Sequence, residues 1–160
     1  MPKQSAGLLV YRLVDGGVEV LAVHPGGPFW AKKDAGAWSI PKGELEPGSP
    51  DEDPYSCARR EFEEELGQHP PDGEPLELGE VRQAGGKTVR VWALAARDDE
   101  IDADAIESNT VEIEWPPRTG RQLQIPEVDR AAWMTPDVAR EKLNESHVVL
   151  MERLLELLGD

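Results

Sequence analysis

Cysteine, long apolar runs and basic residues are all scarce in this 160-residue sequence, and each shortage excludes a class of protein. The only cysteine is Cys57, so the chain can form no internal disulfide and no Cys-rich zinc site. No stretch approaches the roughly 18 apolar residues of a membrane-spanning helix. The apolar run at residues 6–11 is also too short for a secretory signal. We therefore expect a cytoplasmic protein.

Basic residues are outnumbered by acidic ones, 17 against 32, which gives a formal net charge of −15. A surface this negative repels phosphate backbones and anionic lipids, so neither a nucleic-acid polymer nor a membrane is an expected partner. A phosphorylated small molecule remains compatible with this charge, provided that metal ions supply positive charge at the binding site.

The remaining composition, 39% hydrophobic and 31% charged, is typical of a chain that folds, and 160 residues suit one domain spanning 1–160. Short apolar or alternating runs predict strands. These runs lie at residues 6–11, 18–23, 38–40, 76–81, 88–95, 111–115 and 128–134. The segment 136–158 has helical spacing of apolar residues. We therefore expect a domain that mixes α and β structure.

A further helix is predicted at residues 54–66, where start and stop signals are present. Asp53 suits the N-cap, Pro54 suits the first helical position, and Gly67 suits a left-handed C-terminal position. At about 100° per residue, three carboxylates share one edge of this helix, beside the apolar stripe. They belong to Glu61, Glu64 and Glu65. Like charges at this spacing repel each other, so a bound divalent cation would stabilise the cluster; the alternative is a solvated acidic face.

The sequence around this helix resembles the signature of the Nudix family. That signature runs Gly, five residues, Glu, seven residues, then Arg-Glu-aliphatic-x-Glu-Glu-x-Gly-aliphatic. Gly43 opens the pattern here, Glu52 stands eight positions before Arg60, and residues 60–67 reproduce the following part. A signature with this many fixed positions is far more specific than a lone glycine motif.

The sequence departs from the signature at two places. Eight residues instead of five separate the first glycine from the first glutamate, through an insertion within residues 47–51. Gln68 occupies the last aliphatic position. The longer loop leaves open whether Glu44 or Glu46 takes over part of the role of Glu52.

The resemblance implies an α+β Nudix fold, a mixed β-sheet sandwiched between helices as an α/β/α sandwich. It also implies Mg²⁺ or Mn²⁺ as cofactor, which hard carboxylate oxygens favour. Glu64 and Glu65 would be the main metal ligands, with a backbone carbonyl at Lys42 or Gly43 contributing.

The resemblance also implies roles for the other charged residues of the signature. Glu61 would bind metal or deprotonate the attacking water, Arg60 would orient Glu61, and Glu52 would support the cluster. One further metal-binding carboxylate often comes from outside the signature. Glu127 resembles that residue, and Glu112 and Glu114 are the alternatives.

Five residues are candidates for binding substrate. They are Lys42, Trp38, Lys33, Arg118 and Arg121. Lys42 directly precedes the signature and the other three cations lie in glycine-containing loops, where they could bind phosphates. Trp38, like Trp30, could stack on a nucleobase, although a tryptophan in a small domain is more often part of the core.

The leading hypothesis is a Nudix pyrophosphohydrolase, a hydrolase of phosphorus-containing acid anhydrides. Its substrate would be a nucleoside diphosphate derivative, such as a dinucleoside polyphosphate or a nucleoside triphosphate, and the protein would be a monomer or a homodimer. A non-catalytic module that binds a nucleotide is the main alternative. An isomerase of isoprenoid diphosphates is disfavoured, because it would need a catalytic cysteine and Cys57 is better explained as a buried apolar residue.

Overall fold

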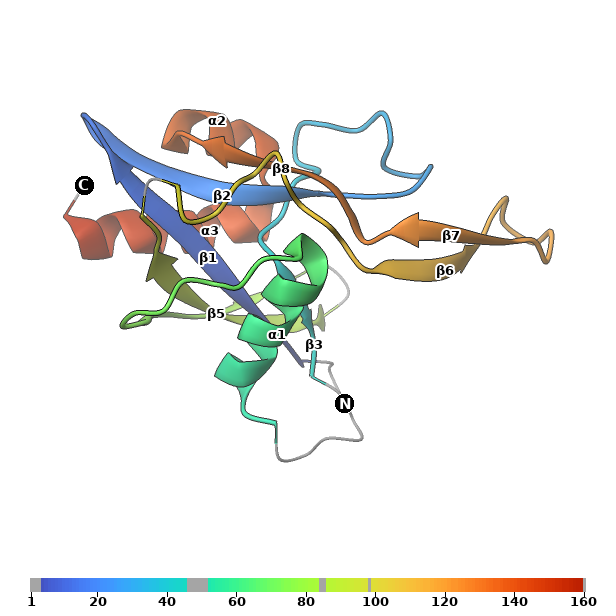
Figure 1. Cartoon of the computed structure of the whole chain (residues 1–160), viewed down its shortest axis with the longest axis horizontal. Helices are drawn as coiled ribbons and strands as arrows, with labels where there is room; N and C mark the ends of the chain where they lie inside the picture. The colour runs from blue at the N-terminus through green and yellow to red at the C-terminus, as the bar shows by residue number, and fades with distance from the viewer. Residues whose placement is uncertain (1–3, 46–51, 84–85, 98, 160) are drawn as a thin grey trace.

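The computed structural model describes residues 4–45, 52–83, 86–97 and 99–159. Its regular elements follow one another along the chain (Figure 1). They are β1 (Gln4–Val14), β2 (Gly17–Pro25), β3 (Lys42–Glu44), α1 (Pro54–Leu66), β4 (Leu76–Arg82), β5 (Thr88–Ala95), β6 (Thr110–Glu114), β7 (Gln122–Pro126), β8 (Val128–Met134), α2 (Pro136–Lys142) and α3 (Glu145–Leu158). The expected insertion within 47–51 and the alternative carboxylate Glu46 lie outside the described residues.

The main sheet is mixed, with strand order β4-β5-β1-β2-β8. β1 runs parallel to β5 and antiparallel to β2, and the short β3 pairs with the beginning of β1. A loop fills the space where β1 and β2 diverge: Leu8 donates to the carbonyl of Pro41, and Ser39 pairs with Val23. This loop leads directly into Lys42 and so places the start of the signature beside the centre of the sheet.

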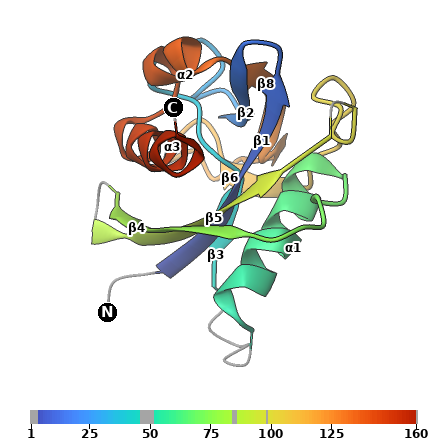
Figure 2. The same cartoon turned by 90° about the vertical axis from the view of Figure 1, so that its left-hand side faces the viewer.

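Helices cover both faces of the sheet, as the expected α/β/α sandwich requires (Figure 2). Side chains of β1 alternate between the two faces, as strand geometry dictates. Leu8 and Val10 belong to the apolar cluster that includes Phe62 of α1, whereas Leu9 belongs to the cluster that includes Met151 of α3. Burial on both faces explains the nearly continuous apolar sequence of this strand.

The helix predicted at residues 54–66 has these bounds, with Asp53 as N-cap and Gly67 in the left-handed conformation at φ 67°. The segment 136–158, by contrast, is two helices and not one. Its break lies at Leu143 and Asn144, because Asn144 caps α3 through the backbone N–H of His147. Within the described residues, no helix is long and apolar enough to cross a membrane.

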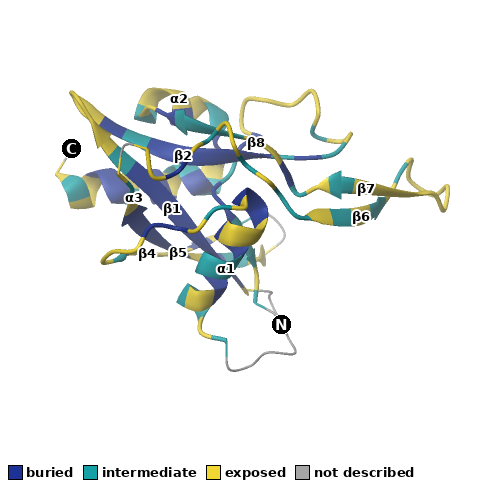
Figure 3. Ribbon diagram, in the orientation of Figure 1, coloured by how far each residue is buried: buried dark blue, intermediate teal, exposed yellow. Residues whose placement is uncertain are grey.

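β6 and β7 form a separate two-stranded arm that extends from the body of the molecule (Figure 1). The strand β7 was not predicted, because Gln122–Pro126 carries two glutamines and stays largely exposed (Figure 3). The expected strand at residues 38–40 is also absent as a regular element. Trp38 and Ser39 form only isolated bridges, to Leu143 and Val23.

Candidate active site

The carboxylate edge of α1 is mostly buried, although three acidic residues share it. The apolar stripe of the helix, with Phe62 and Leu66 fully buried, packs on the sheet. Glu61 and Glu65 lie directly beside this stripe and are only 8% and 7% exposed. Glu64 is more open to solvent, with a side chain 41% exposed. The helix therefore holds two carboxylates in a place where charged groups are costly without a partner.

Gly43 of β3 lies against the carboxylate of Glu61. A Cβ atom added at this position would overlap the Cδ and both oxygens of the Glu61 side chain. The first glycine of the signature is therefore required by a close approach of strand and carboxylate, and not by a positive φ.

Arg60 holds the carboxylates on the outer side of the cluster. Its guanidinium donates two hydrogen bonds to Glu52, with N–O distances of 2.9 and 3.0 Å. The same guanidinium donates to Glu61 and to Glu64, at 3.1 Å each. Paired with Arg60, Glu52 has a pKa below its ordinary value. Despite the longer loop, Glu52 therefore binds the arginine that also contacts Glu61 and Glu64.

Glu52→Gln is expected to lower turnover about 10-fold to 100-fold, the usual cost of losing a residue that orients a metal ligand. The bidentate pair with Arg60 would be replaced by one neutral hydrogen bond, so the guanidinium would orient Glu61 less firmly. Steady-state kinetics compares this variant with Glu63→Gln, because Glu63 lies exposed on the same helix. Equal kinetics for the two variants would contradict this role of Glu52.

Glu65 and Glu127 line the same pocket, and the charge of Glu127 affects the pKa of Glu65. One carboxylate oxygen of Glu65, Oε2, is buried without a hydrogen-bond partner. Glu127, between β7 and β8, accepts a hydrogen bond from the side chain of Asn109 at 2.9 Å. The backbone N–H of Asn109 donates to the carbonyl of Glu64 at 2.8 Å, so Asn109 ties Glu127 to α1.

Burial and like charge act together on these carboxyl groups. Burial raises the pKa of Glu65 well above its ordinary value, and the charge of Glu127 raises it further. Burial and then the charge of Glu64 raise the pKa of Glu61. Both groups are therefore more basic than ordinary glutamates, and a cation among them would relieve the mutual repulsion.

A pocket of about 310 Å³ opens beside these carboxylates, within the usual range for small-molecule sites. Residues from six parts of the chain line it. Among them are Lys42, Gly43, Glu65, Gln83, Lys87 and Glu127. Lys42 and Lys87 add positive charge to a pocket whose other charged groups are carboxylates. The pocket therefore offers groups that suit both an anionic ligand and a metal ion.

The NUDIX domain family matches residues 2–154 of the chain. The chain belongs to the Nudix family. No curated protein matches it. The match includes the signature from Gly43 to Gly67 and all strands of the main sheet. The Nudix fold that the sequence resemblance implied is therefore confirmed.

Solved structures of Nudix-like fold are similar over nearly the whole chain. The Ap4A hydrolase of C. elegans, in a binary complex, has a TM-score of 0.66 at 20% identity, covering 98% of this chain and 99% of that one. The NUDIX domain of Shewanella oneidensis NrtR, complexed with ADP ribose, has a TM-score of 0.67 at 19% identity, covering 99% and 89%. The C-terminal domain of mouse MUTYH, complexed with human PCNA, has a TM-score of 0.60 at 20% identity, covering 100% and 92%. At these identities, the similarity shows a shared fold.

The carboxylates fit the divalent metal that Nudix hydrolases generally use. The donors are hard oxygens, and the buried Oε2 of Glu65 has no partner in the protein. Across the described residues, however, no three His, Cys, Asp or Glu side chains form a ready-made metal site. Since Arg60 contacts Glu61 and Glu64, metal binding would require these side chains to rearrange.

Among the candidates for substrate binding, only Lys42 lines the pocket. Trp38 is 6% exposed and packs in the core, where its indole N–H donates to Asp34. Lys33 places its ammonium 3.7 Å from the ring centre of Phe29, within its own loop. Arg118 and Arg121 are exposed in the turn between β6 and β7. The structure thus leaves these four residues outside the pocket.

The rival carboxylates and the cysteine have other surroundings. Glu112 and Glu114 lie on the β6–β7 arm, and Glu114 accepts a hydrogen bond from the backbone of Arg118. Cys57 is fully buried, and burial raises the pKa of its thiol to about 11. A thiol this weakly acidic is a poor nucleophile, which agrees with its interpretation as a core residue.

The residues at the site that were not anticipated from the sequence include Asn109, Gln83 and Lys87. None lies in the Nudix signature or in a motif of its own: Gln83 and Lys87 belong to the connection between β4 and β5, and Asn109 directly precedes β6. A lysine after a glycine pair, as in residues 85–87, resembles any solvated turn. Only the fold shows that these three residues lie at the site.

Proposed function

We propose that this Nudix protein hydrolyses a phosphoanhydride bond in a nucleoside diphosphate derivative, with Mg²⁺ or Mn²⁺ as cofactor. One observation carries the proposal: Glu65, whose buried Oε2 has no hydrogen-bond partner, lines a pocket that Glu127, Lys42 and Lys87 also line. A buried carboxylate oxygen is costly unless something binds it, and a divalent cation bound to substrate phosphates would do so.

The residues of the chain divide the chemistry between them. Bound Mg²⁺ or Mn²⁺ would neutralise phosphate oxygens and make a water molecule more acidic. Glu65, Glu64 and Glu127 would hold the metal, and the backbone carbonyl of Gly43, a residue that lines the same pocket, would contribute.

Glu61 is the proposed general base. Its raised pKa brings it closer to the operating pH, which increases the driving force for taking a proton from water. Arg60 would keep the carboxylate of Glu61 in place through the 3.1 Å hydrogen bond. Lys42 and Lys87, which line the same pocket, would bind the phosphate chain.

A dinucleoside polyphosphate or a nucleoside triphosphate is the proposed substrate. The similarity to the C. elegans Ap4A hydrolase over 98% of the chain supports this class. The two lysines in the pocket support it independently, because a long phosphate chain offers an acceptor for each of them.

A substrate panel tests the proposal. The purified protein is incubated with Mg²⁺ or Mn²⁺ and dinucleoside polyphosphates, nucleoside triphosphates, ADP-sugars or isopentenyl diphosphate, and the products are identified. Metal-dependent release of nucleotides from the first two groups is the expected result. Binding of nucleotides without any turnover would instead identify a binding module, and isomerisation of isopentenyl diphosphate would identify an isomerase.

A further inference from the structure

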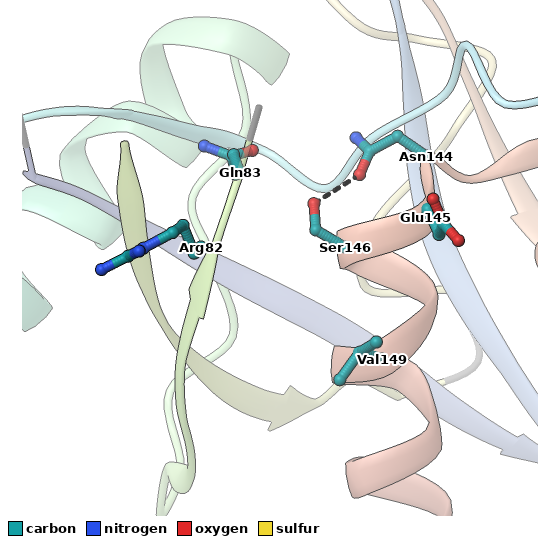
Figure 4. Close-up of a pocket in the computed structure, with 6 residues that line it drawn as sticks. All are labelled: Arg82, Gln83, Asn144, Glu145, Ser146 and Val149. Atoms are coloured by element: carbon teal, nitrogen blue, oxygen red, sulfur yellow. Dashed lines mark hydrogen bonds between the residues drawn. The ribbon is translucent and has the colours of Figure 1, made fainter. Parts of the chain in front are cut away.

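Gln83, the residue after β4, stands between two hollows of the surface. On one side lies the pocket with Glu65, Lys42 and Lys87. On the other side, a hollow of about 830 Å³ separates the end of β4 from the start of α3 (Figure 4). The backbone of Gln83 is held in place, since its N–H donates to the carbonyl of Lys87 and its carbonyl accepts from Gly86.

The side chain of Gln83 contacts the buried ring of His147, in the first turn of α3. The Nε2 atom of His147 lies 3.0 Å from the amide oxygen of Gln83. The other ring nitrogen, Nδ1, lies 3.1 Å from the backbone nitrogen of Ile40. The side-chain nitrogen of Asn144 lies 3.2 Å from the same Nδ1.

These contacts determine where the ring carries its proton. A backbone N–H can only donate, so Nδ1 accepts from Ile40. Burial, together with the charge of Lys42, lowers the pKa of His147 to about 3, and the ring is therefore neutral near pH 7. A neutral ring with an accepting Nδ1 carries its proton on Nε2, and it donates this proton to Gln83.

The histidine therefore dictates the orientation of the Gln83 amide. Because Nε2 donates, the amide oxygen must face His147, and the amide NH₂ group points away from α3 (Figure 4). Within the described part of the chain, no residue accepts a hydrogen bond from this NH₂ group. Two directed N–H donors are thus left for a ligand in the pocket that Gln83 lines.

We propose that Gln83 binds the phosphate chain of the substrate through its amide NH₂ group and that His147 is the positioning residue that aims it. This inference rests on the proposed function. It adds a neutral, directed donor to the two cations that line the same pocket, Lys42 and Lys87, the second of which pairs with Glu44 at 3.3 Å. Lysines attract anions with little directional preference, whereas an oriented amide selects where an acceptor lies.

Binding of two metal-free probes tests the proposal by titration calorimetry. The probes are the non-hydrolysable α,β-methylene analogue of ATP and inorganic tripolyphosphate. Gln83→Met keeps the length of the side chain and removes both hydrogen-bonding groups. Loss of a hydrogen bond to a charged acceptor is expected to weaken the binding of both probes about tenfold or more. The matched control is Gln122→Met, at an exposed glutamine of β7, with unchanged affinities.

The two probes separate the possible results. Equal losses of affinity for both probes support a phosphate contact. A loss confined to the ATP analogue overturns it, because Gln83 would then contact the nucleoside. Unchanged binding of both probes by Gln83→Met also overturns the inference while leaving the proposed function intact. If the wild-type protein binds neither probe without metal, this inference is overturned, whereas the proposed function fails only if the substrate panel shows no metal-dependent turnover.

Two further variants test the positioning role of His147. In Gln83→Glu, one carboxylate oxygen still accepts from His147 while the other replaces the NH₂ group and repels phosphate, so affinity should fall below that of Gln83→Met. His147→Phe should weaken binding in the wild-type background and have no further effect in Gln83→Met. Additive losses of affinity from His147→Phe and Gln83→Met would refute the proposed orientation of the Gln83 amide. A Gln83→Glu variant that binds the probes like the wild type would refute it too. The Gln83→Glu result remains decisive even if His147→Phe fails to fold.

Discussion

Glu65→Gln is expected to lower metal-dependent turnover by about 10²–10³-fold, the usual cost of removing one preorganised charge from an active site. The substitution keeps the shape of the side chain and one oxygen, but it removes the negative charge that would hold the metal. The fold should persist, because the backbone of Lys42 can still donate to the amide oxygen of the variant.

The same substitution is expected to stabilise the metal-free protein at neutral pH. Folding raises the pKa of Glu65, so the folded protein binds more protons than the unfolded chain at pH values between the two pKa values. The contribution of Glu65 to the free energy of unfolding of the wild type should therefore be fully present below the ordinary glutamate pKa of about 4.3 and be lost as the pH rises through the raised value. Glu65→Gln removes this contribution to the pH dependence of the free energy of unfolding.

Two measurements separate function from stability in this variant. Urea unfolding at pH 5 and pH 8 without metal should show a smaller loss of stability with rising pH in Glu65→Gln than in the wild type. Thermal unfolding with added Mg²⁺ or Mn²⁺ should raise the melting temperature of the wild type but not of the variant. Wild-type turnover, or an undiminished metal-induced shift, would show that Glu65 is no metal ligand.

The sequence predicts α1 well because its signals are local. Asp53, Pro54 and Gly67 define the ends of the helix within its own sequence, and the 3.6-residue period places Glu61 and Glu65 beside the apolar stripe. The same local reasoning overlooks the end of α2. There the capping bond of Asn144 interrupts a continuous apolar pattern.

Residues outside the helix are harder to place, because their positions depend on how distant segments pair. Glu127 was predicted from family resemblance as a metal ligand, and that role stays a prediction; the structure ties Glu127 to α1 through Asn109, where its charge raises the pKa of Glu65. Lys33 and Arg118 looked equally suited to bind phosphate in the sequence, yet one lies over Phe29 and the other lies on the β6–β7 arm. Charge and loop composition in the sequence do not show how far a residue lies from the pocket in the folded protein.

The structure also explains how a longer loop is compatible with the Nudix signature. The insertion lengthens the connection before Glu52, whereas the spacing of seven residues from Glu52 to Arg60 is kept. The N-cap at Asp53 starts the helix directly after Glu52. The pairing of Glu52 with Arg60 therefore depends on the helix start and not on the length of the preceding loop.

Gly43→Ala is expected to lower turnover about 10²-fold, because a misplacement of about 1 Å at a reacting group has this cost. The added methyl group would occupy the space of the Glu61 carboxylate, which must then move away from the position held by Arg60. The carboxylate is the far end of a side chain and can swing aside. The free energy of unfolding should therefore fall by only about 1 kcal/mol, the lower end of the usual cost of overpacking.

The matched control is Gly73→Ala, because a Cβ atom at Gly73 meets nothing within 4 Å. Its turnover and unfolding should equal those of the wild type. A double-mutant cycle locates the clash: Gly43→Ala should destabilise the wild type but not Glu61→Ala, in which the overlapping carboxylate is missing. If Gly43→Ala destabilises both backgrounds equally, the glycine serves the pairing of β3 with β1. If the variant keeps wild-type turnover, the close approach of Gly43 to Glu61 has no part in catalysis.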